Sequence, residues 1–270
     1  MKLSCTNAMV PGDTLTQKAL NLKKWGFDAI SLQIPTQQRC DRLTEEILSL
    51  REKTGLAVCE FSYIGKYFGR QMSNDAHISK AALADQKASI DMCARLGAGN
   101  AIGFEYAPRN PLPLFEAPAS MPEELERKFV GILNDVGRYA AERGVELSVE
   151  GINRYETRYA NRLSEIRGYL EKTLPELGIG ILADFFHMAM EERSIPDAIL
   201  ENSGYLRHVH LGENNRMLPG YGALDWRAGF RALKEAGYDG YLALECAVPG
   251  DPYVQLPECA EFLRKCLATC

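Results

Sequence analysis

The chain has 270 residues, of which 46% are hydrophobic and 25% are charged, a composition typical of a globular protein with a sizeable core. Its formal net charge is −5. Binding to a nucleic-acid backbone depends mostly on clustered lysine and arginine, so this acidic balance predicts no nucleic-acid partner.

The eight cysteines form no CxxC pair and fall within apolar segments. A chain of this length does not need disulfides, so we expect reduced structural thiols. The first residues, MKLSCTNAMV, contain one basic residue and no long apolar segment, and no run of about 18 apolar residues follows. These features predict a cytoplasmic protein that does not enter a membrane.

Short apolar runs alternate along the chain with longer segments of helical period. Strands are predicted at residues 2–10, 27–34, 56–64, 100–106, 145–153, 177–186, 206–213 and 240–248. Helices are predicted at residues 14–25, 39–53, 80–96, 122–143, 163–174, 195–202, 226–236 and 257–268. Four of the helices end in KKWGFD, ARLGAGN, AERGVE and KEAGYDG, each with a glycine suited to a left-handed cap.

Eight βα units of about 34 residues each predict an α/β fold, a (β/α)8 TIM barrel that forms a single domain over residues 1–270. A doubly wound open sheet is the alternative, but no GxGxxG or GxxxxGK[ST] loop follows the first strand. The proline-rich residues 106–124 are expected to form a long loop over the mouth of the barrel.

In a TIM barrel the functional residues lie at the carboxyl ends of the strands. Four consecutive predicted strands carry a potential metal ligand at that level: Glu150, Asp184, His210 and Glu245. Adjacent strands are about 4.8 Å apart, so these side chains can converge on one ion. His208 points to the same side of its strand as His210 and is the alternative ligand.

Any one of these residues, taken alone, reads more simply as a helix cap or a surface acid. Three carboxylates buried together, however, require a cation to compensate their charge. Three oxygen ligands and one imidazole favour Mn²⁺ or Co²⁺, with Mg²⁺ or Zn²⁺ as alternatives. Glu156, His187, Glu213 and Arg216 stand near this centre, either as a solvated loop network or as groups that bind a polyhydroxylated substrate.

The segments SVEGINRYET, ADFFHMAMEE, HVHLGENNRMLPGYGALDW and LALE resemble, in order and spacing, motifs of the xylose isomerase-like sugar isomerase and epimerase superfamily. They are most similar to those of the D-tagatose 3-epimerase and D-psicose (allulose) 3-epimerase family. The resemblance is specific from Val145 onward.

The resemblance implies a role for each matching position. Glu150 and Glu245 match two metal-bound glutamates that also act as the acid/base pair. Asp184 and His210 match the remaining metal ligands, and Glu156, His187 and Arg216 match residues that bind the substrate. The family also implies a homodimer or homotetramer.

Epimerisation beside a ketone needs a Lewis acid on the substrate oxygens and a base near the C–H bond, and two glutamates on either side of an ion can invert the carbon. The sequence and the resemblance thus predict an enzyme, a metal-dependent ketose 3-epimerase. We expect it to act on a free sugar rather than a sugar phosphate, because no Lys or Arg follows the PGYG turn before Arg227 to bind a phosphate. Gln33 stands where many relatives carry a glutamate, and Glu105 in GFEY is unusual. The identity of the ketose is therefore open.

Other activities remain as alternatives. An aldose-ketose, hydroxypyruvate or inosose isomerase, or a keto-inositol dehydratase, would keep the barrel and the metal. An apurinic endonuclease-like barrel would need more histidines than the four in this chain. A sugar-binding barrel without activity would not need the paired glutamates.

Overall fold

The computed structural model describes residues 1–104, 115 and 120–270. Its sheet contains eight strands in the order β3-β2-β1-β8-β7-β6-β5-β4, and every pair of neighbours in this order is parallel. The strands are β1 (Lys2–Thr6), β2 (Ala29–Ile34), β3 (Ala57–Tyr63), β4 (Asn100–Ile102), β5 (Leu147–Glu150), β6 (Gly180–Asp184), β7 (Leu206–Leu211) and β8 (Tyr241–Leu244).

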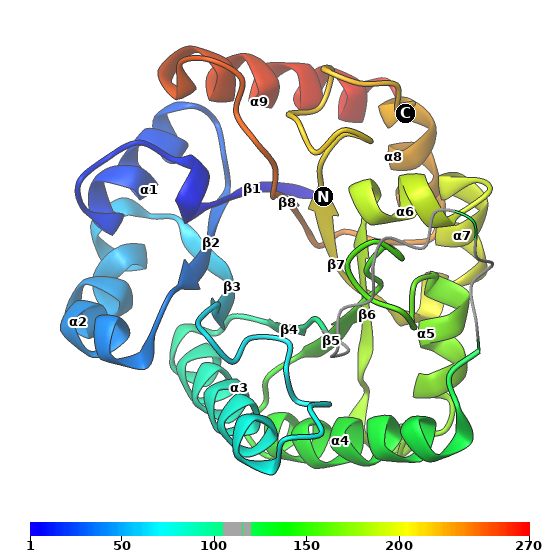
Figure 1. Cartoon of the computed structure of the whole chain (residues 1–270). Helices are drawn as coiled ribbons and strands as arrows, with labels where there is room; N and C mark the ends of the chain where they lie inside the picture. Colours follow the sequence, from blue (N-terminus) through cyan, green and yellow to red (C-terminus); the bar gives the residue numbers. More distant parts are fainter. Residues whose placement is uncertain (105–114, 116–119) are drawn as a thin grey trace.

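The backbone of Gly99 joins the two ends of this order into a ring. Its N–H donates to the carbonyl of Cys59 at 3.0 Å, and its carbonyl accepts from the N–H of Phe61 at 3.2 Å. The helices surround the ring of strands (Figure 1). They are α1 (Leu15–Lys24), α2 (Gln37–Thr54), α3 (Ala76–Leu96), α4 (Glu123–Ala141), α5 (Leu163–Leu170), α6 (Phe185–Glu191), α7 (Ile195–Glu201), α8 (Trp226–Glu235) and α9 (Pro252–Ala268). The predicted (β/α)8 barrel is confirmed.

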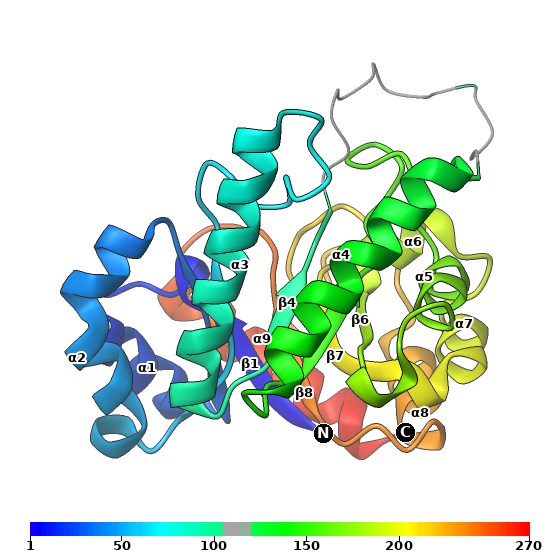
Figure 2. The same ribbon diagram turned by 90° about the horizontal axis from the view of Figure 1, so that it is seen from below.

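Both termini lie at the end of the barrel where the strands begin (Figure 2). The opposite end therefore carries the carboxyl ends of the strands and the loops that follow them. In a barrel of this kind the interior is packed with side chains, so a binding site is expected at that opposite end.

The predicted glycine caps are confirmed: Gly26, Gly97, Gly144 and Gly237 all have positive φ. The strands are shorter than predicted. Short 3₁₀ turns also occur at Asn7–Met9, Pro175–Leu177 and Ser203–Tyr205.

Two helices, α6 and α9, differ most from the sequence prediction. The sequence pattern predicts a strand through residues 185–186, but the Asp184 side chain accepts from the N–H of Phe186 and starts α6 directly after β6. The last helix begins at Pro252, five residues before the predicted start at Pro257. Asp251 caps it, and Pro252 occupies the first turn, where a missing N–H costs nothing.

The inner faces of the helices pack on the outside of the barrel through apolar side chains. At α6, for example, the ring of Phe185 stacks on Trp226 with 5.3 Å between centroids, and both side chains are buried. This packing fixes the start of α6 and therefore the position of Asp184, which precedes Phe185. None of the helices in the described part of the chain combines the length and apolarity needed to cross a bilayer.

Two expectations fall outside the described residues. Glu105 and most of the proline-rich segment 106–124 lie among residues 105–114 and 116–119, which the structure does not describe. The predicted loop over the barrel mouth therefore stays a prediction.

Candidate active site

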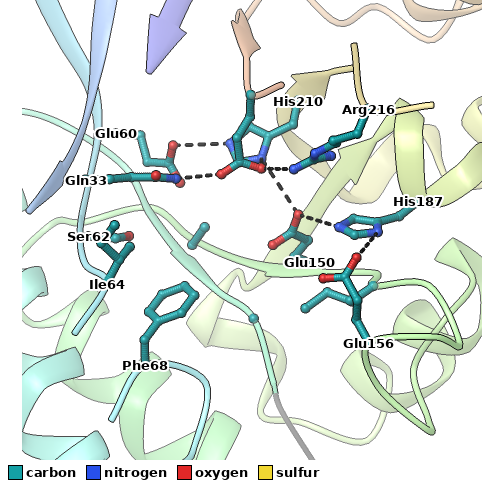
Figure 3. Close-up of a pocket in the computed structure, with 14 residues that line it drawn as sticks. Gln33, Glu60, Ser62, Ile64, Phe68, Glu150, Glu156, His187, His210 and Arg216 are labelled. Atoms are coloured by element: carbon teal, nitrogen blue, oxygen red, sulfur yellow. Dashed lines mark hydrogen bonds and ion pairs between the residues drawn. The ribbon is translucent and has the colours of Figure 1, made fainter. Parts of the chain in front are cut away.

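A cavity of about 260 Å³ opens at the carboxyl ends of the strands. Figure 3 shows Gln33 and Glu60 on one side of it, His187 and Glu156 on the other, and Ile64 and Phe68 along a third edge. Its lining consists of Gln33, Glu60, Ser62, Ile64, Phe68, Ala101, Gly103, Glu150, Ile152, Glu156, His187, His210, Arg216 and Glu245.

The four side chains predicted to bind a metal converge beside this cavity. Each of Glu150, Asp184, His210 and Glu245 offers one ligand atom within 4.8 Å of the others. The Nδ1 atom of His210 is the common point: it lies 3.3 Å from Glu245, 3.7 Å from Glu150 and 3.9 Å from Asp184. The sequence prediction that these four residues meet agrees with this geometry.

The sheet explains why they meet. Asp184 and His210 are register partners of β6 and β7, so their side chains are neighbours. Glu150 ends β5, and Glu245 follows β8 directly, where its N–H donates to the carbonyl of Leu211 at 3.1 Å. Four adjacent strands thus present one ligand each at the same height of the barrel.

The cluster has an excess of negative charge. Although burial opposes it, the pKa of His210 is raised well above its usual range, chiefly by Glu245 and Glu60. Burial raises the pKa of Glu150. Burial also acts to raise the pKa of Glu245, but His210, Arg216 and the amide of Gln33 outweigh it, and the pKa of Glu245 falls.

A divalent cation fits this donor set. Nδ1 of His210 is buried, has no hydrogen-bond partner among the described residues, and faces three carboxylates. A cation among these atoms would give Nδ1 a partner and would offset the excess negative charge. Three carboxylate oxygens and one imidazole form a hard, oxygen-rich ligand set.

His208 lies deeper in the barrel and is not part of this group of four. Its Nε2 atom lies 3.8 Å from Glu60 and has no hydrogen-bond partner among the described residues. Burial lowers the pKa of His208 to about 4, so the imidazole is neutral at pH 7. Of the two histidines on β7, His210 is the one that faces the carboxylates of Glu150, Asp184 and Glu245.

His187 projects into the cavity from α6. The backbone N–H of Asn153 donates to its Nδ1 atom at 3.3 Å, which leaves the proton on Nε2. That Nε2 atom points toward Glu150, at 3.6 Å. Glu156 stands beside this pair, because the amide of Asn153 donates to its carboxylate at 2.9 Å.

Arg216 bridges two of the candidate ligands. Its guanidinium forms ion pairs with Asp184, at 2.5 Å, and with Glu245. It also lies over the ring of Phe186, 4.6 Å from the centroid. The residue has φ of +59°, a strained backbone conformation for a side chain of this size, and it lines the cavity.

Glu213 does not join the residues around the cavity, contrary to expectation. It is fully buried, and its carboxylate accepts from the N–H groups of Gly220 and Leu224 and from the indole of Trp226. Glu213 therefore holds the loop after β7 in place.

The first half of the barrel contributes residues that sequence reasoning left undefined. Gln33 donates its amide to Glu245 at 2.5 Å. Glu60, which sequence reasoning missed, contacts His210 from β3 at 3.2 Å. A signal was present, because Glu60 is a lone charge in an apolar strand, and a buried charge needs a partner.

Comparison with known proteins finds relatives of this chain among sugar epimerases. The 3-dehydro-D-guloside 4-epimerase of Escherichia coli K12 is 27% identical over 280 residues, which cover 98% of this chain and all of that protein. A ketose 3-epimerase of Arthrobacter globiformis is 32% identical over 173 residues, but this alignment covers 64% of the chain and 58% of that enzyme.

Among solved structures, the apo form of 3-keto-D-glucoside 4-epimerase from E. coli superposes with a TM-score of 0.86 at 26% identity, over 98% of this chain and all of that one. The family described as xylose isomerase-like TIM barrel matches residues 20–266. The chain therefore belongs to the xylose isomerase-like TIM barrel family.

Proposed function

We propose that this chain is a metal-dependent sugar epimerase, and more specifically a ketose 3-epimerase that acts on a free ketose of the D-tagatose or D-psicose type. The observation that carries this proposal is the placement of Glu150 and Glu245 beside one cavity, both within 4 Å of Nδ1 of His210. The ketose 3-epimerase of A. globiformis supports the reaction, while the substrate rests on the resemblance of the motifs.

Glu150, Asp184, His210 and Glu245 would hold the ion, for which we propose Mn²⁺ or Co²⁺, with Mg²⁺ and Zn²⁺ as alternatives. When bound, such an ion stabilises negative charge on the carbonyl and hydroxyl oxygens of a hydroxyketone. The identity of the ion belongs to the proposal, because these ligands accept several divalent metals.

The two glutamates would exchange protons with the substrate. One carboxylate removes the proton from C3, the C–H electron pair forms the C2–C3 double bond, and the carbonyl electrons move to O2. The other glutamate, protonated, returns a proton to the opposite face of C3, and the C2 carbonyl forms again. One glutamate gains a proton and the other loses one, so the pair returns to its starting state by exchange with water.

Three further residues would bind the substrate. The proton on Nε2 of His187 points into the cavity and can be donated to a substrate oxygen. Glu156 is half exposed and can accept from a hydroxyl group. Arg216 supplies guanidinium donors beside Asp184 and Glu245.

A second candidate substrate has an observation in its favour. The E. coli relative that aligns with the whole chain is a 3-dehydro-D-guloside 4-epimerase. Inversion at C4 beside a C3 ketone is the same proton exchange moved one carbon along the sugar. An epimerase of 3-keto glycosides is therefore the alternative to the ketose 3-epimerase.

A substrate panel tests the proposal. The protein with Mn²⁺ or Co²⁺ is incubated with D-fructose, D-tagatose, D-psicose and a 3-keto-D-glucoside, and the products are identified by NMR. Inversion at C3 of a ketose supports the first proposal, and inversion at C4 of the glucoside supports the second. An aldose product would indicate an isomerase, and no turnover of any of these sugars would contradict the proposal.

The proposal extends to the setting of the enzyme. All eight cysteines are free and lie within the described residues, which supports a reducing compartment such as the cytoplasm. We propose a homodimer or homotetramer with a small sugar, rather than nucleic acid, as its partner. Light scattering of the purified protein measures the assembly directly.

A further inference from the structure

Glu60 is a buried carboxylate on the inner side of the barrel, in the strand sequence AVCEFSY. The register of β2 and β3 shifts at this point: Ile30 pairs with Val58, but the next residue, Ser31, pairs with Glu60. The extra residue, Cys59, forms a bulge, a device that re-aims a side chain. Ser31 then donates its hydroxyl to Oε2 of Glu60 at 2.7 Å.

The same carboxylate oxygen lies 3.2 Å from Nε2 of His210 (Figure 3). The two nitrogens of this imidazole therefore have different surroundings. Nε2 faces the carboxylate of Glu60 on β3, whereas Nδ1 faces the three carboxylates at the ends of β5, β6 and β8. A neutral imidazole carries a proton on one nitrogen and a lone pair on the other.

We infer that Glu60 is the positioning residue for His210: it accepts the proton of Nε2, and so fixes the ring and directs the lone pair of Nδ1 toward the metal. This inference rests on the metal site of the proposed function. It adds a residue from the first half of the barrel, where the motifs of the resemblance do not reach. A carboxylate behind a histidine ligand orients the ring and increases its basicity.

His208 is not the histidine that Glu60 positions for this metal. It lies on the same strand as His210, and its Nε2 atom approaches Glu60 only at 3.8 Å, without a hydrogen bond. The three side chains Glu60, His208 and His210 nevertheless lie close enough to hold an ion themselves. The experiment therefore has to distinguish a positioning carboxylate from a second set of ligands.

The first test measures binding of Co²⁺ alone, without sugar, by absorption and by competition with a chelator. We expect wild type to bind one equivalent. Glu60→Leu, which removes the acceptor, should weaken Co²⁺ binding about 10- to 100-fold and change the visible spectrum. Glu60→Gln keeps an acceptor oxygen but loses the charge, so its Co²⁺ affinity should fall less than that of Glu60→Leu. His208→Asn serves as the control and should match wild type in affinity, stoichiometry and spectrum.

Two results would overturn the inference. Unchanged Co²⁺ affinity and spectrum in both Glu60 variants would show that His210 needs no partner. Two equivalents in wild type, falling to one in Glu60→Leu and in His208→Asn, would make Glu60 a ligand of a second ion. If wild type binds no Co²⁺, the proposed function itself fails, which is a separate outcome.

A measurement on the wild-type protein does not depend on how the variants fold. In ¹⁵N-histidine-labelled protein with Zn²⁺, long-range proton–nitrogen spectra report which nitrogen of each ring carries the proton. We expect His210 to carry it on Nε2, with its Nδ1 resonance shifted by the metal. A proton on Nδ1 of His210 would contradict the positioning role of Glu60.

Discussion

The guanidinium of Arg216 lies 2.5 Å from Oδ2 of Asp184, while the other carboxylate oxygen, Oδ1, accepts from the N–H of Phe186 at 2.8 Å. One oxygen of Asp184 therefore faces the candidate metal site, and the other caps α6. Because the two oxygens have different partners, a substitution can separate their effects.

Asp184→Asn keeps an oxygen that can cap α6 but removes the negative charge. Asn and Asp are about equal as helix caps, so we expect a small change in the stability of the metal-free protein and a large loss of metal affinity. Calorimetric titration with Mn²⁺ and thermal unfolding measure the two effects. A variant with normal metal affinity would exclude Asp184 as a ligand.

A helix cap outside the site gives the matched control. Ser194 accepts from the N–H of Asp197 and caps α7. Ser194→Ala should lower stability by about 1 kcal/mol and leave metal affinity unchanged. A fall in metal affinity in this control would show that affinity follows stability in general.

Removal of the metal should destabilise the protein. An ion that binds only the folded state stabilises it by mass action, by about 2.7 kcal/mol when the free ion is at 100 times its dissociation constant. We expect a chelator to lower the melting temperature and to abolish turnover, and added Mn²⁺ or Co²⁺ to restore both. Full activity after complete chelation would contradict the metal-dependent mechanism.

The four convergent side chains could be predicted because they follow a rule of geometry. Glu150, Asp184, His210 and Glu245 each lie at the carboxyl end of a parallel strand or next to it, and parallel strands in a barrel end at one level. Their spacing along the chain thus translates directly into proximity. The roles of these residues in a reaction could not be predicted in this way, and came from the resemblance.

Other contacts depend on details that periodicity does not carry. Glu60 meets His210 only because a bulge shifts the register of β2 and β3. The sequence pattern does not reveal the start of α6, because Asp184 both ends a strand and caps a helix, and the apolar Phe185 and Phe186 continue the pattern of the strand. Glu213 carries a charge typical of a binding loop, yet it is fully buried as an acceptor for loop N–H groups.

Arg216→Ala should affect the substrate more than the metal. Its guanidinium pairs with Asp184 and Glu245, so its removal takes a positive charge away from the metal site and should not weaken cation binding. Hydrogen bonds to charged groups contribute about 1.5–3 kcal/mol, so we expect a higher KM and a kcat/KM about 10- to 100-fold lower. Steady-state kinetics at saturating Mn²⁺ gives these values. Loss of bound metal would show that Arg216 belongs to the metal site.

Replacement by glutamine should affect fold stability at Glu213 but activity at Glu156. Glu213→Gln places an amide group among three N–H donors and should destabilise the fold by about 1–3 kcal/mol. Glu156→Gln, at a half-exposed position on the cavity, should leave the melting temperature unchanged and lower kcat/KM. Denaturant unfolding and kinetics on both variants check this. A stable Glu213→Gln or a fully active Glu156→Gln would contradict the assignment of that residue.

The fate of solvent deuterium tests the proposed chemistry most directly. In D₂O with Mn²⁺ or Co²⁺ and D-fructose, D-tagatose or their C3 epimers, we expect the inverted ketose to carry deuterium at C3 and little at C1, because one glutamate removes the C3 proton and the other returns a proton that exchanges with water. Glu150→Gln and Glu245→Gln should each nearly abolish conversion, since an amide neither accepts nor returns the proton. Label confined to C1 and C2, an aldose product, or normal turnover in either glutamate variant would contradict epimerisation by this pair.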